Sequence, residues 1–388
     1  MKFWFTSIAV ATALAAPSFA QAQDTVRIGI ALSQTGNLAD SAKHYWRGVE
    51  LWRDDVNARG GLLGKKVEFV VYDDRSDPAT SARLYERLIT SDKVDLLIST
   101  IGSAQAATAT AVAEKHKRVM INGGGASESI QLRGFKYIFQ TAARISAYVD
   151  GIDPLMKKYH VKSMAFVSRD YGAARDMEKV VKEMAKKNGV EMVMDEYFPS
   201  GNVDFSSQIA RARQTKPDLW VSVGYPNEAI EMTRQFRASN YTPKIFVHNG
   251  VAQEDYLKAA GKDAEGAIGM SLYEPTLKTT GNAQFVKDFQ ARYKYEPGYY
   301  SSFGYTAVSV LEAAVKKAGS FDQEKLRGVL TTMKMDTIMG KHEVDPKTGM
   351  QLGIRGLLVQ VQNGQREIVW PNELKTADAK LPLPGAER

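Results

Sequence analysis

The stretch STIGSAQAATATAVAEK, residues 99–115, joins a short apolar run to a helix-like segment, with Gly102 and Ser103 at the junction. A serine placed there could be a nucleophile, a phosphate binder, a helix cap or the floor of a pocket for a small anion. The first turn of a helix has unpaired N–H groups and a partial positive charge. With the hydroxyl as a further donor, these residues suit a seat for a carboxylate or a plain helix cap.

Motifs that would make this junction an enzyme or a nucleotide site are absent from the sequence. Ser103 has no GxSxG pattern around it, because Gly102 is its direct neighbour. The segment GGLLGKK at 60–66 lacks the glycine spacing and the Ser or Thr of a phosphate-binding loop. The glycines of INGGGAS at 121–127 lack the dinucleotide-binding spacing. The carboxylate seat and the helix cap therefore stay open as alternatives.

Composition excludes several further classes of function. The 388 residues include no cysteine, which removes disulfides, thiol catalysis and cysteine metal sites. The five histidines are scattered, so we expect neither a metal nor another cofactor. The formal charge of +7 comes from basic residues mixed with acidic ones, and no basic stripe with exposed aromatics indicates nucleic-acid binding.

The N-terminus has the pattern of a secretory signal peptide. Lys2 precedes an apolar stretch over 3–16, and AQA at 20–22 offers a small-x-small cleavage site. We therefore predict cleavage after Ala22 and a mature chain that begins at Gln23. No lipobox cysteine is present, so we expect a free exported protein with a formal charge of +6 after Lys2 is removed.

Strand and helix patterns alternate along the first part of the mature chain. Short apolar runs alternate with segments in which apolar residues recur at helical spacing. An Asp77–Pro78 pair marks one helix start, and glycines mark helix ends. We predict strands at 26–32, 66–74, 94–100 and 118–122, with helices at 43–59, 78–91 and 103–115. This order is typical of a parallel sheet covered by helices.

The same alternation begins again after residue 160. We predict strands at 162–170, 190–198, 218–224 and 244–250, with helices at 171–189, 204–216 and 226–240. The last third contains helices at about 282–295, 300–318 and 322–333, and strand-like runs at 341–345 and 355–370. It holds no third lobe, so these pieces must complete the first two. Ligands of open α/β sheets bind beyond the carboxyl ends of the strands, which places a cleft between the lobes.

This order of features resembles the leucine/isoleucine/valine-binding family of type I periplasmic binding proteins, which serve ABC importers. The resemblance is carried by 28–36, 54–78, the Ser103 junction, 169–176 and 336–349. It implies an α/β fold of two doubly wound parallel-sheet lobes, joined by a three-crossover hinge. The implied organisation is a signal peptide at 1–22, a first lobe at 23–144 with about 275–350, a second lobe at 145–274 with about 351–374, and a C-terminal tail at 375–388.

The resemblance also implies which residues meet the ligand. Ser103 matches the serine that binds the ligand carboxylate. The remaining implied positions are Gly124 and Ala126 on one loop, with Ser127 in place of the usual threonine hydroxyl at 126, and the aromatic residues Tyr171, Tyr225 and Tyr300. From its place at the first crossover, Arg144 could pair with a carboxylate, or it could be a surface arginine. Trp46 and Phe303 are expected to pack in a lobe core.

Asn249 departs from the pattern of the family. Amino-acid-binding members have an acidic residue there, which neutralises the ammonium group of the ligand. A buried ammonium without a counter-charge is costly. We therefore expect a carboxylate, amide or aromatic acid as the ligand, and not necessarily a simple α-amino acid.

The sequence thus predicts a non-enzymatic periplasmic solute-binding protein that delivers its ligand to an inner-membrane ABC permease, with a monomer as the family expectation. A ligand-sensing receptor or regulator on the same fold is one alternative. An exported α/β hydrolase is another, although no nucleophile, histidine and acid assemble from the sequence.

Overall fold

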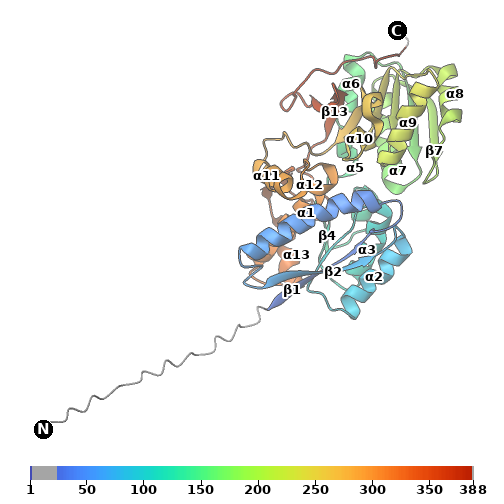
Figure 1. Ribbon diagram of the computed structural model, residues 1–388. Helices are drawn as coiled ribbons and strands as arrows, with labels where there is room; N and C mark the ends of the chain where they lie inside the picture. Colours follow the sequence, from blue (N-terminus) through green and yellow to red (C-terminus); the bar gives the residue numbers. More distant parts are fainter. Residues whose placement is uncertain (2–23, 387–388) are drawn as a thin grey trace.

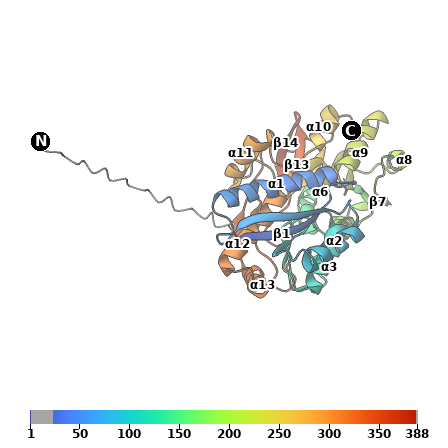
Figure 2. The same cartoon turned by 60° about the horizontal axis from the view of Figure 1, so that its bottom comes forward.

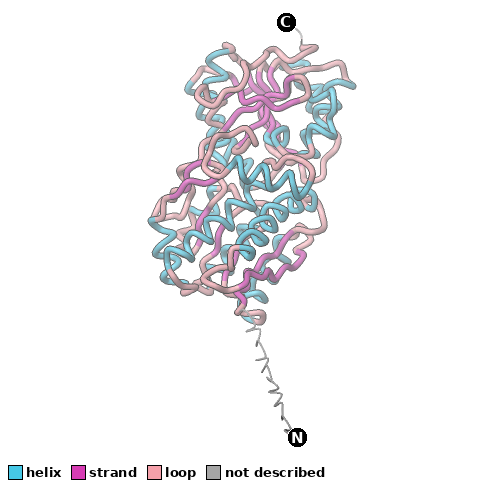
Figure 3. The backbone as a smooth tube through the Cα atoms, turned by 60° about the vertical axis from the view of Figure 1, so that its left-hand side comes forward, coloured by secondary structure: helices cyan, strands magenta, loops and turns pink. Residues whose placement is uncertain are grey.

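A computed structural model of the protein shows two α/β lobes stacked end to end (Figure 1). The structure describes Met1 and residues 24–386. The predicted signal peptide therefore lies, apart from Met1, outside the described residues. Each lobe has its own sheet, and Figure 3 shows the two groups of strands apart from one another, with helices around them. Within the described part of the chain, no helix combines the length and apolar character needed to cross a bilayer.

The first lobe is built on a five-stranded parallel sheet in the order β2-β1-β3-β4-β5. Its strands are β1 Thr25–Leu32, β2 Lys66–Asp73, β3 Leu96–Ile98, β4 Met120–Asn122 and β5 Ile138–Gln140. The helices from the same part of the chain are α1 Ala39–Ala58, α2 Pro78–Thr90, α3 Ser103–Lys115 and α4 Glu128–Gln131. Figure 2 shows α1 lying along β1 and β2.

Segments from the last third of the chain complete this lobe. Helices α11 Asn282–Tyr293, α12 Tyr299–Ala318 and α13 Gln323–Thr332 return to it, with a small antiparallel pair, β11 Met335–Thr337 and β12 Gly340–His342. Helix α12 packs along α1, and its buried side chains join those of β1, β3 and β4 in one core. The opposite face of the sheet packs against α2 and α3.

The second lobe has a seven-stranded sheet in the order β14-β13-β10-β9-β8-β6-β7. Its strands are β6 Ser163–Arg169, β7 Glu191–Phe198, β8 Leu219–Ser222, β9 Ile245–His248, β10 Ile268–Ser271, β13 Leu357–Gln362 and β14 Gln365–Trp370. Its helical segments are α5 Ile145–Tyr148, α6 Ile152–Lys158, α7 Gly172–Lys187, α8 Ser206–Thr215, α9 Pro226–Ala238, α10 Tyr256–Ala260, and the 3₁₀ turns η1 Asn249–Ala252 and η2 Gly261–Ala264.

The second sheet is not purely parallel. Strand β13 pairs antiparallel with β10, and β14 pairs antiparallel with β13. A hairpin from the end of the chain thus extends a sheet whose other pairs are parallel. The chain passes between the lobes in the segments 141–144, 272–281 and 343–356, which agrees with the expected three-crossover hinge.

The predicted helices and long strands are confirmed, with ends that differ by a few residues. Three strands were not predicted, β5, β10 and β11, which have three, four and three residues. Runs this short are too brief to show a period. β5 and β10 are buried on both faces of their sheets, so they carry no alternation of apolar and polar residues. In the sequence, such a short run cannot be told from a buried loop.

Candidate ligand-binding site

A small cavity of about 40 Å³ lies between the two lobes. This volume is several times the ~10–15 Å³ that one water needs. Seven of the nine predicted site residues line it: Ser103, Gly124, Ala126, Tyr171, Tyr225, Asn249 and Tyr300. Seven further lining residues were not predicted: Gly102, Ile145, Tyr148, Ala173, Gly224, Tyr299 and Phe303. The lining has no charged side chain.

Ser103 is the first residue of α3, and it does not cap that helix. The N-cap is Gly102, with φ at 89°, a conformation that favours glycine, and no side chain caps α3. The Ser103 Oγ instead accepts a hydrogen bond from the Ser127 backbone N–H at 3.2 Å. The plain-cap interpretation is therefore wrong. Gly102 and Ser103 both line the cavity, so the first turn of α3, with its unpaired N–H groups, begins at the cavity wall.

A close backbone approach holds the neighbouring loop against this helix start. Gly124 forms a parallel bridge with Ile101, and a Cβ at position 124 would lie 2.5 Å from the Ile101 Cα. Only glycine fits there without a shift of the backbone. Residues 124 and 126 thereby reach the cavity wall beside Ser103.

Two tyrosines form the wall on the second lobe. Tyr171 and Tyr225 are the N-cap residues of α7 and α9, and their ring centroids are 6.0 Å apart. The Arg169 guanidinium lies over the Tyr225 ring at 4.8 Å and pairs with Glu228 at 3.1 Å. The positive charge of Arg169 is therefore balanced within the second lobe.

Four long helices, α3, α7, α9 and α12, begin at the cavity, and two of them already hold a carboxylate of the chain at their first turn. The Tyr225 N–H at the start of α9 donates to Glu228 at 2.9 Å. At the start of α12, the backbone N–H groups of Tyr300 and Ser301 donate to Glu254 at 2.8 and 3.1 Å. Helices α3 and α7 have no side-chain cap. The partial positive charge of their first turns is left for a bound anion.

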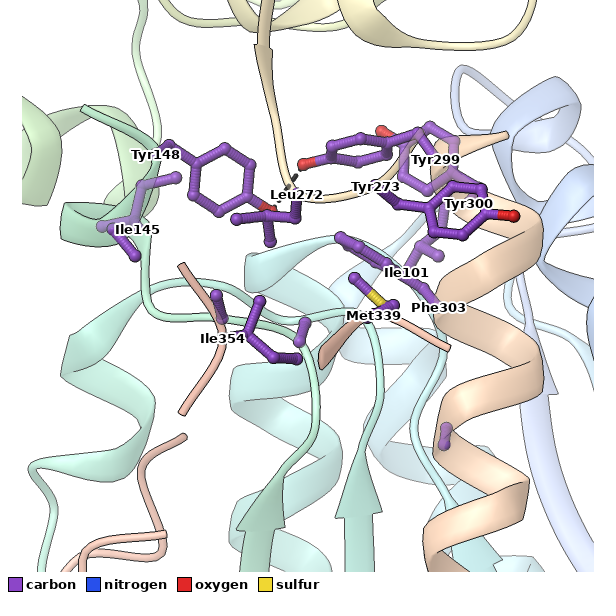
Figure 4. Close-up of a cluster of buried hydrophobic side chains, with 14 of the residues drawn as sticks. Ile101, Ile145, Tyr148, Leu272, Tyr273, Tyr299, Tyr300, Phe303, Met339 and Ile354 are labelled. Carbon is purple, nitrogen blue, oxygen red and sulfur yellow. Dashed lines mark hydrogen bonds between the residues drawn. The ribbon is translucent and has the colours of Figure 1, made fainter. Parts of the chain in front are cut away.

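Aromatic side chains cover the hinge side of the cavity. Figure 4 shows Tyr148 of α5 and Tyr299 of α12 directed toward each other, and the Tyr299 hydroxyl donates to the Tyr148 hydroxyl at 2.5 Å. Phe303 packs in the core as expected and also reaches the cavity. Burial raises the pKa of the Tyr148, Tyr299 and Tyr300 hydroxyls, so these groups stay protonated and neutral at physiological pH.

Asn249 presents a donor to the cavity. Its Oδ1 accepts a hydrogen bond from the Gly224 backbone N–H at 2.9 Å, which fixes the orientation of the amide because a backbone N–H can only donate. The Nδ2 group of this buried side chain donates to no residue in the described part of the chain. The position that would need an acceptor for a ligand ammonium therefore offers N–H donors.

Two predicted residues lie outside the cavity lining. The Ser127 hydroxyl donates to Asp176 of α7 at 2.5 Å and thereby joins the two lobes. The Arg144 guanidinium, at the start of α5, donates to the Ser146 hydroxyl at 2.9 Å. Sequence patterns could not indicate either side-chain direction. Trp46 packs on Phe69, with ring centroids 5.2 Å apart.

A cavity between two hinged α/β lobes, with helix starts and tyrosines on its wall, defines a solute-binding protein. Residues 25–365 match the family described as periplasmic binding protein, and the chain belongs to that family. An amino acid binding protein of Pseudomonas aeruginosa is 26% identical over 330 residues, which cover 84% of this chain and 88% of that protein. Because such relatives are solute-binding proteins, this chain is a binding protein and not an enzyme.

Solved structures share the fold. The branched-chain amino acid transporter substrate binding protein LivJ of Streptococcus pneumoniae, in complex with isoleucine, has a TM-score of 0.80 and 24% identity, covering 90% of this chain and all of that one. A solute binding protein of an ABC transporter from Rhodopseudomonas palustris, in complex with 3,4-dihydroxybenzoic acid, has a TM-score of 0.81 and 24% identity, covering 94% and 99%.

Proposed function

We propose that this protein is the periplasmic component of an ABC importer and captures a small carboxylate that carries no α-ammonium group. The lobes close on the ligand, and the closed form delivers it to an inner-membrane permease. The observation that carries the proposal is the uncapped first turn of α3, with Ser103, in a cavity whose lining has no charged side chain. A carboxylate gains charge-assisted hydrogen bonds there.

The electrostatics of the cavity disfavour an amino acid. An ammonium group would face the Nδ2 donors of Asn249 without a carboxylate to pair with, and burial of such a charge is costly. Glu228 and Glu254 are the acids at the starts of α9 and α12, but each already accepts a hydrogen bond from a backbone N–H there. An acid with an apolar body avoids this cost.

The aromatic lining supports a planar or bulky apolar body for the ligand. Tyrosine and phenylalanine rings pack well against another ring in offset or edge-on arrangements. Among the proteins described above, one is named for amino acids, one solved structure holds isoleucine and another holds a dihydroxybenzoic acid. The donors at Asn249 favour the second kind of ligand for this chain. We accordingly propose an aromatic or other organic acid.

The remaining predictions complete the proposal. We propose that the signal peptide is cleaved after Ala22 and that the mature protein is a periplasmic monomer. We also propose the lobe boundaries given above, 23–144 with about 275–350 and 145–274 with about 351–374. Ser103, Gly124, Ala126, Tyr171, Tyr225, Asn249 and Tyr300 are proposed as ligand contacts. Ser127 is proposed to act through lobe closure, and Arg144 has no role at the cavity in this proposal.

Matched ligands test the proposal directly. The mature chain, refolded to remove any retained solute, is titrated by calorimetry with leucine and 4-methylpentanoate, and with phenylalanine and 3-phenylpropanoate. Within each pair only the α-ammonium group differs. We expect heat of binding from the acids and none from the amino acids. Binding of the amino acids alone would overturn the proposal, as would an absence of binding by these acids and by benzoate.

A further inference from the structure

A pair of buried tyrosines at the cavity shares a single hydrogen bond. Tyr148 on α5 and Tyr299 at the start of α12 both line the cavity, and Figure 4 shows their side chains directed toward each other. The Tyr299 hydroxyl donates to the Tyr148 hydroxyl at 2.5 Å. Two hydroxyl groups carry two hydrogen atoms, and this bond uses only the one on Tyr299. The hydrogen of the Tyr148 hydroxyl is therefore left over.

This remaining hydrogen has no acceptor in the described part of the chain. Burial raises the pKa of both hydroxyls, so the pair keeps both of its hydrogens at physiological pH. Buried donors in folded proteins are nearly always paired, because an unpaired one loses its hydrogen bonds to water without replacement. An acceptor for the Tyr148 hydroxyl is therefore expected on a molecule in the cavity.

The tyrosines of the second lobe place this hydroxyl at the cavity. Burial is the main cause of the raised pKa of Tyr148, the hydrogen bond from Tyr299 opposes it, and Tyr225 raises it further. Burial likewise raises the pKa of Tyr171, and Tyr148 adds to that effect. Electrostatic effects of this kind fall off with distance, so the Tyr148 hydroxyl lies near the hydroxyls of Tyr171 and Tyr225. All three side chains line the same cavity as Ser103.

We infer that Tyr148 and Tyr299 form a second polar subsite of the cavity, which binds a hydroxyl group that the ligand carries in addition to its carboxylate. The inference rests on the proposed function, in which the start of α3 and Ser103 hold the carboxylate. Tyr148 donates its remaining hydrogen to the ligand hydroxyl, and Tyr299 is a positioning residue that fixes the direction of the Tyr148 hydroxyl.

The chemistry of the pair favours a hydroxyl over other groups. A ligand hydroxyl accepts the hydrogen of Tyr148 and also has a hydrogen to donate to a tyrosine oxygen. An ammonium group has no acceptor and leaves the Tyr148 hydrogen unpaired. The carboxylate seat lies between α3 and the loop of Ser127, whereas the pair lies between α5 and α12, so the two subsites meet different parts of the ligand. The ligand class is accordingly a hydroxy acid.

Two variants separate this role from a structural one. Tyr148→Phe removes the donor and keeps the packing of the ring. The double variant Tyr148→Phe/Tyr299→Phe removes both hydroxyls, and replacement of both members of a buried hydrogen-bonded pair by apolar groups of the same shape is nearly neutral for stability. Tyr256→Phe is the matched control. Tyr256 is equally buried and its hydroxyl pairs with that of Thr233 at 2.8 Å, but this pair lies inside the second lobe and does not line the cavity.

The test is calorimetric titration with pairs of acids of nearly equal size, in which a methyl group replaces the hydroxyl. The pairs are 4-hydroxybenzoate with 4-methylbenzoate, 3-hydroxybenzoate with 3-methylbenzoate, and 4-hydroxypentanoate with 4-methylpentanoate. For at least one pair, we expect the wild-type protein and Tyr256→Phe to bind the hydroxy acid about tenfold more tightly, since its hydroxyl pairs an otherwise unpaired donor. In Tyr148→Phe and in the double variant, the ratio of the two Kd values should fall to about one. A general loss of fit weakens both members of a pair, so this ratio reports the hydroxyl contact.

The outcomes distinguish this inference from the proposed function. If the methyl acids bind and no hydroxy acid is preferred by the wild type, the inference is wrong and the proposed function stands. A preference that survives in both variants also overturns the inference, as does its loss in Tyr256→Phe. If no acid binds at all, the proposed function fails and the inference fails with it. Should one of the two variants not fold, the other carries the comparison.

Discussion

The hydroxyl of Ser127 on the first lobe donates a hydrogen bond to the carboxylate of Asp176 on the second, at 2.5 Å. This bond exists only while the lobes are together. The same serine donates its backbone N–H to the Ser103 hydroxyl at the cavity. Lobe closure and the geometry of the proposed carboxylate seat are therefore coupled through one residue.

Asp176→Asn should weaken ligand binding without a change in the stability of the separate lobes. A hydrogen bond of this kind contributes about 1 kcal/mol, so we expect the Kd to rise by about fivefold. Calorimetry with the acid that binds best gives the Kd, and small-angle scattering gives the fraction of closed protein. Asp170→Asn is the control, because Asp170 pairs with Arg175 inside the second lobe. An unchanged Kd in Asp176→Asn would show that this bond does not favour closure.

Ser103→Ala should weaken the binding of every carboxylate ligand. Loss of a buried hydrogen bond to a charged group costs about 1–3 kcal/mol, whereas the unfolding temperature should not fall by the amount expected for a lost helix cap. The reason is that Ser103 does not cap α3. Calorimetry and thermal unfolding measure the two effects separately. Ser207→Ala, at an exposed position of α8, is the control. Wild-type affinity in the Ser103→Ala protein would show that the ligand carboxylate does not bind at the start of α3.

The two-lobe fold was predictable because the long helices and strands show a periodic spacing of apolar residues, and the helices have recognisable residues at their ends. Asp77 caps α2 through its side chain, as the Asp-Pro pattern indicates. The short strands β5 and β10 could not be predicted, since their strand geometry comes from neighbours that are distant in sequence. The antiparallel hairpin at the sheet edge likewise depends on tertiary pairing.

The site was predictable at the positions where a strand or helix start fixes the backbone. Ser103, Tyr171 and Tyr225 lie at such starts and line the cavity. Side-chain direction was not predictable at Arg144, which turns to Ser146. The lining role of Tyr148 was missed because it depends on the crossover that brings α5 to α12. A tandem of tyrosines after Gly298 was the one sequence signal that could have indicated Tyr299.

Asn249→Asp should admit amino acids to the cavity. Aspartate keeps the size of the side chain and an oxygen acceptor for the Gly224 N–H, while it replaces the Nδ2 donors with a second carboxylate oxygen. An ammonium group then gains the counter-charge that it lacks in the wild type. We expect measurable binding of leucine or phenylalanine, and at least tenfold weaker binding of the matching acids through charge repulsion. Calorimetry with the matched pairs checks both changes, and Asn240→Asp, on the turn after α9, is the control. Continued exclusion of amino acids by the Asn249→Asp variant would show that Asn249 does not set the preference.

Ligand affinity should increase as the pH falls from 8 to 6, because of a second contact between the lobes. His44 of α1 and Asp255 of the second lobe form an ion pair with 3.1 Å between Nε2 and Oδ2. Burial of His44 lowers its pKa, but the hydrogen bond to Asp255 and the charges of Glu254 and Asp255 outweigh burial and Arg47, and the net pKa is raised. Tyr295 contacts the other ring nitrogen at 3.0 Å.

The sign of the effect follows from that direction. A pKa raised in the closed form means that protonated His44 favours closure, fully so below the ordinary value near 6.5, and that this contribution is lost as the pH rises through the raised pKa. Asp255 is half exposed, so we expect no more than about a fivefold change in Kd, as for other solvent-screened pairs. The change should vanish in His44→Gln and in Asp255→Asn. His116→Gln is the control, because His116 pairs with Glu86 inside the first lobe and closure does not alter that pair. Calorimetry across this pH range checks the slope, and a slope that persists in both His44→Gln and Asp255→Asn would assign it to another group.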